Sequence, residues 1–244
     1  MNLQSDFLHR LESIVSSAGE LAQSCRTGLQ MDLKPDGSIV TNADREVEKY
    51  LFDGLSRLAP KATFWGEESG FAPPGPDGAW LIDPIDGTSN FYFGLPLWGV
   101  TVGFIQLGRV IAGSVALPDL GWSFRAMEGQ GAELNGEPMI SAKPGPILPF
   151  ELVGQADDGA KAFDTIPGKR RHFGAFVVEA MFVAKGGIRG LLSTKARLYD
   201  VAGSLVVLRE LGYRVVTADM APFDESHWHI DSPCGPFAVL PPEP

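Results

Sequence analysis

One stretch, Trp80–Phe91 (WLIDPIDGTSNF), constrains the fold of this chain more than any other segment. A short apolar run typical of a buried strand leads directly into Asp83 and Asp86, and Gly87 and Thr88 follow where a helix can begin. Carboxylate oxygens suit a hard cation such as Mg²⁺, and the free N–H groups of a helix N-terminus suit an anion. The stretch therefore predicts a turn that holds a divalent metal ion and a phosphate group side by side.

Pro84 shapes the turn between the two aspartates. It fixes its own φ and pushes Asp83 out of the helical region, so that both carboxylates and the carbonyl of Ile85 can face one centre. The structural alternative is an Asp-Pro turn followed by an Asp-Gly turn, with the carboxylates acting as backbone caps. That alternative accounts for either aspartate alone, whereas the complete string favours the metal and phosphate site.

Other acidic residues lie at the ends of predicted elements. Asp44 falls in the first turn of a predicted helix, Glu67 and Glu68 follow a predicted strand, and Asp200 opens another predicted helix. Each has an ordinary explanation as a helix cap, a partner of the helix dipole or a solvated side chain. Because binding groups collect at the ends of elements, these residues are also the candidates for further metal ligands.

Hydrophobic periodicity and turn residues predict the surrounding elements. Helices are predicted over Phe7–Cys25, from the N-cap Thr41 to Leu58, over 174–185 and from Asp200 to Leu211. Strands are predicted over 62–65, Gly99–Ile105, Arg109–Leu117, 121–127, 131–134 and Tyr213–Thr217, and Gln106–Gly108 joins the second and third of these as a hairpin.

A segment rich in proline, 141–149, predicts a boundary between two domains. The N-terminal α+β half, 1–140, carries most candidate ligands, and the C-terminal α/β half, 141–244, carries Asp200 and the substrate wall. Residues 150–173 show weak periodicity. The basic cluster at their end, Lys169–Arg171, is interpreted as a solvated loop, and the tail from Pro222 is predicted to be irregular.

The charge and cysteine content limit the possible partners and compartments. With 20 Lys and Arg against 30 Asp and Glu, the net charge is −10, which disfavours nucleic acid as a partner, although Lys169–Arg171 leaves that role open. Cys25 and Cys234 do not make a disulfide framework. No apolar run reaches the ~20 residues of a membrane span, and the N-terminus lacks the apolar core of a signal peptide. We therefore expect a cytoplasmic protein with no membrane segment.

The acidic segments occur in a familiar order. Asp44, Gly66–Glu68, Asp83–Thr88 and Tyr199–Asp200 follow one another as in the lithium-sensitive, Mg²⁺-dependent phosphatases, and from about Lys34 to Asp224 the chain resembles the inositol monophosphatase family. The resemblance implies an α+β fold, the layered αβαβα sandwich of the inositol monophosphatase and fructose-1,6-bisphosphatase type, usually a homodimer. Its second half would be shortened, because 150–173 is short where the family has another strand and helix.

The resemblance also implies the metal ligands, for two to three Mg²⁺ ions per site. The first ion would be held by Glu67, Asp83 and the carbonyl of Ile85, and the second by Asp83, Asp86 and Asp200. A third, weaker ion would be bound at Glu67 through water.

Catalytic and substrate-binding roles follow from the same resemblance. Thr88 and Asp44 would orient and deprotonate the attacking water, with Glu67 contributing through its metal. The N–H groups of Gly87 and Thr88 would bind the phosphate, and Asp86 would assist the leaving alkoxide. Gly174, Ala175 and Ser193 complete the expected substrate side.

Departures from the family pattern affect the choice of substrate. The usual Trp-Asp pair is Tyr199-Asp200 here, and Ser193 stands where inositol-hydrolysing members usually carry a glutamate. The segment Lys34–Thr41 looks more like relatives that act on nucleotide 3′-phosphates or histidinol phosphate.

The expected function is therefore that of an Mg²⁺-dependent phosphomonoesterase. Its substrate would be a small phosphorylated metabolite: an inositol monophosphate, a sugar phosphate or a nucleotide 3′-phosphate. The alternative is a regulatory or protein-interaction member of the family that binds metal with little catalysis.

Overall fold

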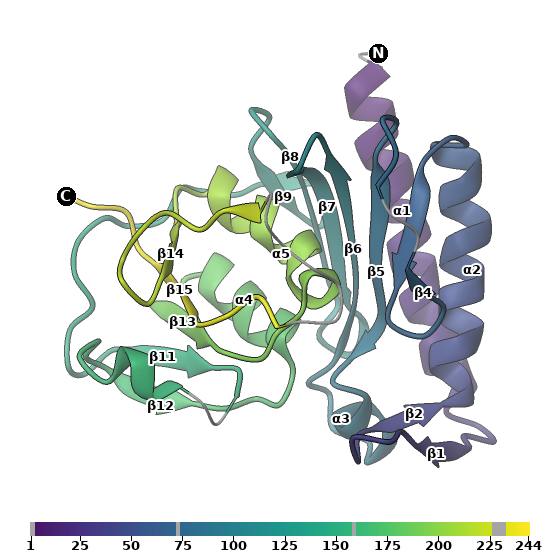
Figure 1. The fold of residues 1–244 in the computed structure, drawn as a ribbon, viewed down its shortest axis with the longest axis horizontal. Helices are drawn as coiled ribbons and strands as arrows, with labels where there is room; N and C mark the ends of the chain where they lie inside the picture. Colours follow the sequence, from purple (N-terminus) through teal and green to yellow (C-terminus); the bar gives the residue numbers. More distant parts are fainter. Residues whose placement is uncertain (1–2, 72–73, 158–159, 226–232) are drawn as a thin grey trace.

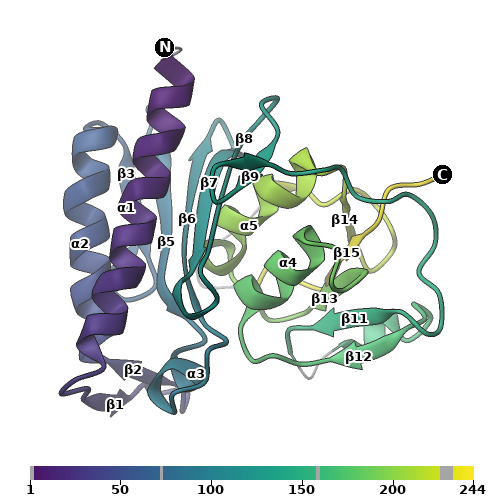
Figure 2. The same ribbon diagram turned by 180° about the vertical axis from the view of Figure 1, so that it is seen from behind.

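Four layers of secondary structure make up the part of the chain that the computed structural model describes, residues 3–71, 74–157, 160–225 and 233–244. Helices α1 (Leu3–Cys25) and α2 (Asn42–Leu58) cover one face of an eight-stranded sheet (Figure 1). Helices α4 (Phe176–Ala184) and α5 (Leu198–Glu210) lie between that sheet and a five-stranded sheet, as the view from behind also shows (Figure 2). This order of layers confirms the predicted α+β sandwich.

The two outer helices form where the sequence predicts them. The side chains of α1 that recur at helical spacing and are fully buried are Leu11, Val15, Ala18 and Ala22. α2 begins with a capping box, in which the Thr41 hydroxyl accepts the N–H of Ala43 at 3.2 Å and the Asp44 carboxylate accepts the N–H of Thr41 at 2.8 Å. The predicted N-cap is confirmed, and the cap places Asp44 fully buried next to the sheet.

The large sheet has the strand order β10-β9-β8-β7-β6-β5-β3-β4. Its strands are β3 (Thr63–Gly66), β4 (Gly70–Phe71), β5 (Ala79–Asp86), β6 (Gly99–Gln106), β7 (Arg109–Leu117), β8 (Trp122–Met127), β9 (Ala132–Leu134) and β10 (Glu137–Pro138). The predicted hairpin of β6 and β7 is confirmed. β3 and β5 run parallel, with Gly66 opposite Ile82. Because parallel strands end at the same edge, Glu67 lies beside Asp83.

Small residues let α5 approach the large sheet closely. A Cβ atom added to Gly103 of β6 would lie 2.4 Å from the Cβ of Ala202, and one added to Gly203 would lie 2.2 Å from the hydroxyl of Thr101. Neither side chain fits without movement of the backbone. The two glycines therefore set the distance between α5 and the sheet, and this distance fixes the position of Asp200.

The five-stranded sheet corrects two predictions. Its order is β12-β11-β13-β15-β14, with β11 (Leu152–Gln155), β12 (Lys169–Arg171), β13 (Gly190–Ser193), β14 (Arg214–Thr217) and β15 (Phe237–Leu240). The basic cluster is therefore an edge strand and not a loop. The tail is not irregular throughout, because β15 is a buried strand between β13 and β14. Both strands are too short to show periodicity, and pairing with distant segments makes them strands.

Among the described residues, the last helical layer is reduced to one short 3-10 helix, Ala160–Phe163. Phe163 packs with Val153, Leu192 and Leu240 on the outer face of the small sheet. This agrees with the predicted shortening of the second half. A small hairpin of β1 (Met31–Leu33) and β2 (Ile39–Thr41) lies outside both large layers. None of the helices in the described ranges is long and apolar enough to span a bilayer.

Candidate active site

Three carboxylates from three separate elements converge at the edge where β3 and β5 end. Glu67, Asp83 and Asp200 each offer an oxygen atom, and these atoms all lie within 4.8 Å of one another. Asp83 is buried, and the other two are partly exposed. Asp200 was predicted to open α5 but is its third residue, because the helix begins at Leu198. Its carboxylate accepts the N–H of Arg197 at 2.7 Å.

A break in the pairing of β5 with β6 turns the two aspartates of the opening motif. The register shifts between Asp83 and Asp86, where Pro84 donates no hydrogen bond. The N–H of Ile85 then donates to the Asp83 carboxylate at 3.0 Å. The backbone N–H of Val177, at the start of α4, donates to the Asp86 carboxylate at 2.6 Å. The turn is therefore held both by its own backbone and by a helix more than ninety positions away in the chain.

The cluster is electrostatically costly without a cation. Burial raises the pKa of Asp83 well above its ordinary value, and the charges of Glu67, Asp86 and Asp200 raise it further. Burial likewise raises the pKa of Asp200, and it raises that of Asp86 to about 7 although backbone N–H groups lower it. A donor set of carboxylate oxygens whose charges repel one another fits a hard divalent cation.

Lys34 and Glu48 belong to this region, although the sequence did not single them out. The Lys34 ammonium lies 2.8 Å from the Glu67 carboxylate and 2.6 Å from that of Glu68. Glu48 accepts the N–H of Glu68 at 3.1 Å, and a Cβ atom on Gly66 would lie 2.0 Å from its carboxylate. Glu48 lies one helical turn after Asp44 on a face otherwise apolar, and that spacing was the available signal.

Asp44 and Thr88 form a second polar pair beside the carboxylates. The Thr88 hydroxyl lies 2.9 Å from the carbonyl of Ile85 and 3.2 Å from the Asp44 carboxylate. Burial raises the pKa of Asp44 to about 6, although hydrogen bonds from Thr41 lower it. The two residues predicted to act on water therefore lie within hydrogen-bond distance, and the Ile85 carbonyl faces the same hydroxyl.

Gly87 is required by its position before α3 (Thr88–Tyr92). Its φ of +86° suits glycine, and an added Cβ atom would lie 2.8 Å from the Cβ of Ala175 and 3.0 Å from the carbonyl of Leu97. The turn that follows β5 and the turn before α4 are therefore in contact at Gly87.

A cleft of about 280 Å³ opens from the carboxylates toward the small sheet. Its lining consists of Asp86, Ala156, Asp157, His172, Gly174, Ala175, Phe176, Ser193, Lys195, Ala196 and Asp200. The predicted substrate residues Gly174, Ala175 and Ser193 thus line one cleft with two of the predicted ligands.

The Ser193 side chain is engaged within the protein. It is fully buried, and its hydroxyl donates to the Asp157 carboxylate at 3.2 Å. Asp157, which the sequence analysis missed, also accepts the N–H groups of Thr194 and Lys195 at 2.6 Å and 2.9 Å. Asp157 therefore holds the turn that leads into α5, and Ser193 supplies no carboxylate to the cleft.

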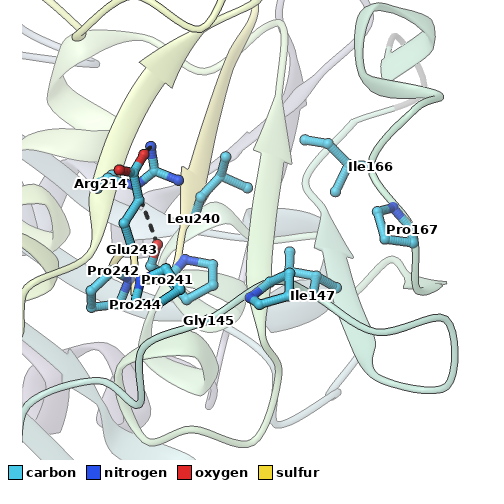
Figure 3. A pocket seen from close by; sticks show the side chains of 11 residues that line it. Gly145, Ile147, Ile166, Pro167, Arg214, Leu240, Pro241, Pro242, Glu243 and Pro244 are labelled. Atoms are coloured by element: carbon cyan, nitrogen blue, oxygen red, sulfur yellow. Dashed lines mark hydrogen bonds and ion pairs between the residues drawn. The ribbon is translucent and has the colours of Figure 1, made fainter.

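A larger pocket of about 430 Å³ lies on the far side of the small sheet (Figure 3). Ile147, Ile166 and Leu240 contribute apolar side chains to it, and Arg214 pairs with Glu243 at 2.7 Å. It shares no lining residue with the carboxylate cleft. The smaller cleft is the candidate active site, because it alone of the two combines space with converging titratable groups.

Known proteins share both this sequence pattern and this fold. The chain is 31% identical over 200 residues to an inositol-1-monophosphatase of Mesorhizobium japonicum, covering 75% of this chain and 74% of the relative. It is 28% identical to a histidinol-phosphatase of Streptomyces coelicolor, covering 83% and 84%. An IMPase structure from Thermotoga maritima superposes with a TM-score of 0.82 at 25% identity, covering 94% and 89%. The profile of the inositol monophosphatase family matches residues 4–233, so the chain belongs to the inositol monophosphatase family.

Proposed function

We propose that this phosphoric monoester hydrolase uses Mg²⁺ to hydrolyse a small phosphorylated metabolite in the carboxylate cleft. The observation that carries the proposal is the convergence of Glu67, Asp83 and Asp200, with oxygen atoms within 4.8 Å of one another, next to a cleft that Asp86 also lines. Phosphoryl transfer requires positioning and neutralisation of charge more than covalent chemistry, and a carboxylate-bound metal pair supplies both.

The ligand assignment divides the cluster into two sites with Asp83 in common. Glu67 and the Ile85 carbonyl would complete one site, and Asp86 and Asp200 the other. Bound Mg²⁺ would neutralise phosphate charge and lower the pKa of water. The protein's part is to hold these oxygens in place through the hydrogen bonds from Ile85, Val177 and Arg197.

Thr88 and Asp44 would move the proton of the attacking water. The Thr88 hydroxyl lies within reach of both Ile85 and Asp44, so it can accept a proton from water while donating its own to the Asp44 carboxylate. The pKa of Asp44, raised to about 6, leaves it ionised at neutral pH but more basic than an ordinary aspartate.

The scissile phosphate would be bound by backbone N–H groups of Gly87 and Thr88, next to Gly174 and Ala175, with Asp86 on the leaving-group side. The alcohol would then occupy the rest of the cleft. Ser193 offers no carboxylate to the hydroxyl groups of an inositol ring, and the named relatives act on different alcohols. We therefore propose the substrate only as a small phosphate monoester.

A phosphatase panel tests the proposal. It should contain inositol 1-phosphate, fructose 1,6-bisphosphate, adenosine 3′,5′-bisphosphate and histidinol phosphate, each with Mg²⁺, with and without Li⁺. We expect Mg²⁺-dependent release of phosphate from at least one ester. If none is hydrolysed while Mg²⁺ still raises the thermal stability of the protein, the regulatory alternative is correct.

A further inference from the structure

The backbone of Phe173, between the cleft-lining residues His172 and Gly174, is held from both sides. The N–H of Phe173 donates to the Glu179 carboxylate at 2.7 Å, and the carbonyl of Phe173 accepts from the side-chain amide of Asn90 at 2.7 Å. The same amide donates to the carbonyl of Leu97 at 2.6 Å, so both of its hydrogens are used. Asn90 belongs to α3 and Glu179 to α4, so residues of two separate elements meet at Phe173.

The residues after Phe173 form the part of the cleft wall that contacts the turn at the end of β5. Gly174 has φ +78°, and a Cβ atom there would lie 3.1 Å from the Asn90 amide nitrogen. Ala175 touches the position where Gly87 lacks a side chain, and Val177 donates to Asp86. A shift of the Phe173 backbone would therefore displace both the cleft wall and the N–H group that donates to Asp86.

Glu179 does not line the cleft, yet its environment is unusual for a carboxyl group. It is fully buried in a helix otherwise built of apolar residues, and one of its carboxylate oxygens has no hydrogen-bond partner within the described ranges. Burial raises its pKa to about 8, although the Phe173 N–H lowers it, so the neutral acid dominates at neutral pH. A buried carboxyl group is costly to keep, and an apolar residue of similar size would avoid that cost.

We propose that Asn90 and Glu179 are positioning residues that act as one clamp on Phe173 and thereby hold the Gly174–Ala175 wall and the first turn of α4 against Asp86. This inference rests on the proposed function, since the wall matters for binding only if the cleft takes a phosphate ester. Asn90 connects the Gly174–Ala175 wall to α3, and Glu179 connects it to α4. Both act through the backbone of Phe173 and not through contact with the substrate.

Three single variants of the full chain, loaded with Mg²⁺, separate positioning from simple stability. In Asn90→Ala and in Glu179→Leu we expect KM for the hydrolysed ester to rise about tenfold or more, the size of effect seen when groups that orient a metal site are lost. Glu179→Leu should keep or raise Tm, because it removes a buried polar group. Glu179→Gln keeps the acceptor and should stay within about threefold of the wild-type KM.

The double variant Asn90→Ala/Glu179→Leu tests whether the two residues form one clamp. Since either change loosens the backbone of the same residue, Phe173, the KM of the double variant should exceed that of the worse single variant by less than about threefold. The inference would be overturned if the KM increases of the two single variants multiplied in the double variant. It would also be overturned if the single variants had the wild-type KM.

Hydrogen exchange of residues 172–177, measured without substrate, keeps the test independent of the proposed function. Faster exchange in Asn90→Ala and Glu179→Leu, but not in Glu179→Gln, is expected even if no ester of the panel is hydrolysed. Unchanged exchange in both would show that Phe173 is held by other contacts.

Discussion

The two sides of the cleft are built in different ways. On the motif side, Asp83, Asp86, Gly87 and Thr88 lie within one strand end and one turn. Hydrogen bonds inside that segment hold Asp83 and Thr88, and Val177 adds one bond to Asp86 from outside it. On the facing side, the turns at 172–176 and 193–196 follow strands of the small sheet. Asp157 and Asn90, which are distant in sequence, hold them together with Glu179, six positions after Phe173. In the proposed function, the motif side would carry the chemistry, and the facing side would supply the shape that selects the alcohol.

The largest effect should come from the motif side. Asp83→Asn removes a charge from the centre of the cluster, and we expect Mg²⁺-dependent kcat/KM to fall by more than about 100-fold. Asp77→Asn, an exposed aspartate outside the site, is the control and should behave as wild type. Turnover retained in Asp83→Asn with bound metal verified would remove Asp83 from the proposed site.

The proton path should give the next largest effect. Thr88→Ala removes the hydroxyl between Ile85 and Asp44 and should lower kcat about 100-fold, with KM changing much less. Thr88→Ser keeps the hydroxyl and should recover most of the activity. Equal kcat in the two variants would show that the hydroxyl carries no proton.

Gly87→Ala tests the contact between the two sides. The new methyl group would meet Ala175 at 2.8 Å at a positive φ, and we expect the free energy of unfolding to fall by about 2–3 kcal/mol. Gly129→Ala is matched, because Gly129 also has a positive φ but nothing within 4 Å, and about 1 kcal/mol is expected there. If the free energy of unfolding falls by the same amount in both variants, the two sides of the cleft are not in close contact at Gly87.

The pH dependence of the metal-free protein should reveal the buried carboxyl groups on both sides. Burial raises the pKa of Asp44 to about 6, of Asp86 to about 7 and of Glu179 to about 8. The folded protein therefore binds more protons than the unfolded chain between about pH 4 and pH 8, so its free energy of unfolding falls as the pH rises through that window. Tm measured in EDTA should decline over this range, and Mg²⁺ should remove most of the decline. A flat Tm profile in EDTA would contradict the assigned burial.

Ser193→Ala should have the smallest effect. The hydroxyl contacts Asp157, which retains the N–H groups of Thr194 and Lys195 as donors, so kcat/KM should change by less than about threefold. A change of KM confined to one ester of the panel would instead make Ser193 a specificity residue.

Local patterns predicted the motif side and much of the large sheet. The cap at Thr41, the hairpin of β6 and β7 and the end of β5 each depend on a few adjacent residues, so the sequence was sufficient to place them. The division of the chain near 141–149 stays a prediction. α4 and α5 pack between both sheets, and their core residues join with Val115 and Phe124 of the large sheet and Leu191 and Phe237 of the small one.

The facing side was not predictable in the same way. β12 and β15 are too short to show a period, and Asp157 and Glu179 have ordinary surface or helical explanations when read alone. The same holds for Lys34 and Glu48, which lie beside Glu67 and Glu68. Their roles depend on the segments against which they pack, and one sequence does not display those segments.

By itself, the sequence determined the family and the proposed metal- and phosphate-binding turn, because strand and turn preferences act over a few bonds and the Asp83–Thr88 string contains that turn. Only the tertiary structure decided that Glu67 and Asp200 meet Asp83, that Ser193 faces inward to Asp157, and that Phe173 is held between Asn90 and Glu179. The reason is physical: those contacts form when apolar surfaces of distant segments are buried together, and the position of each polar group then depends on the whole packed core.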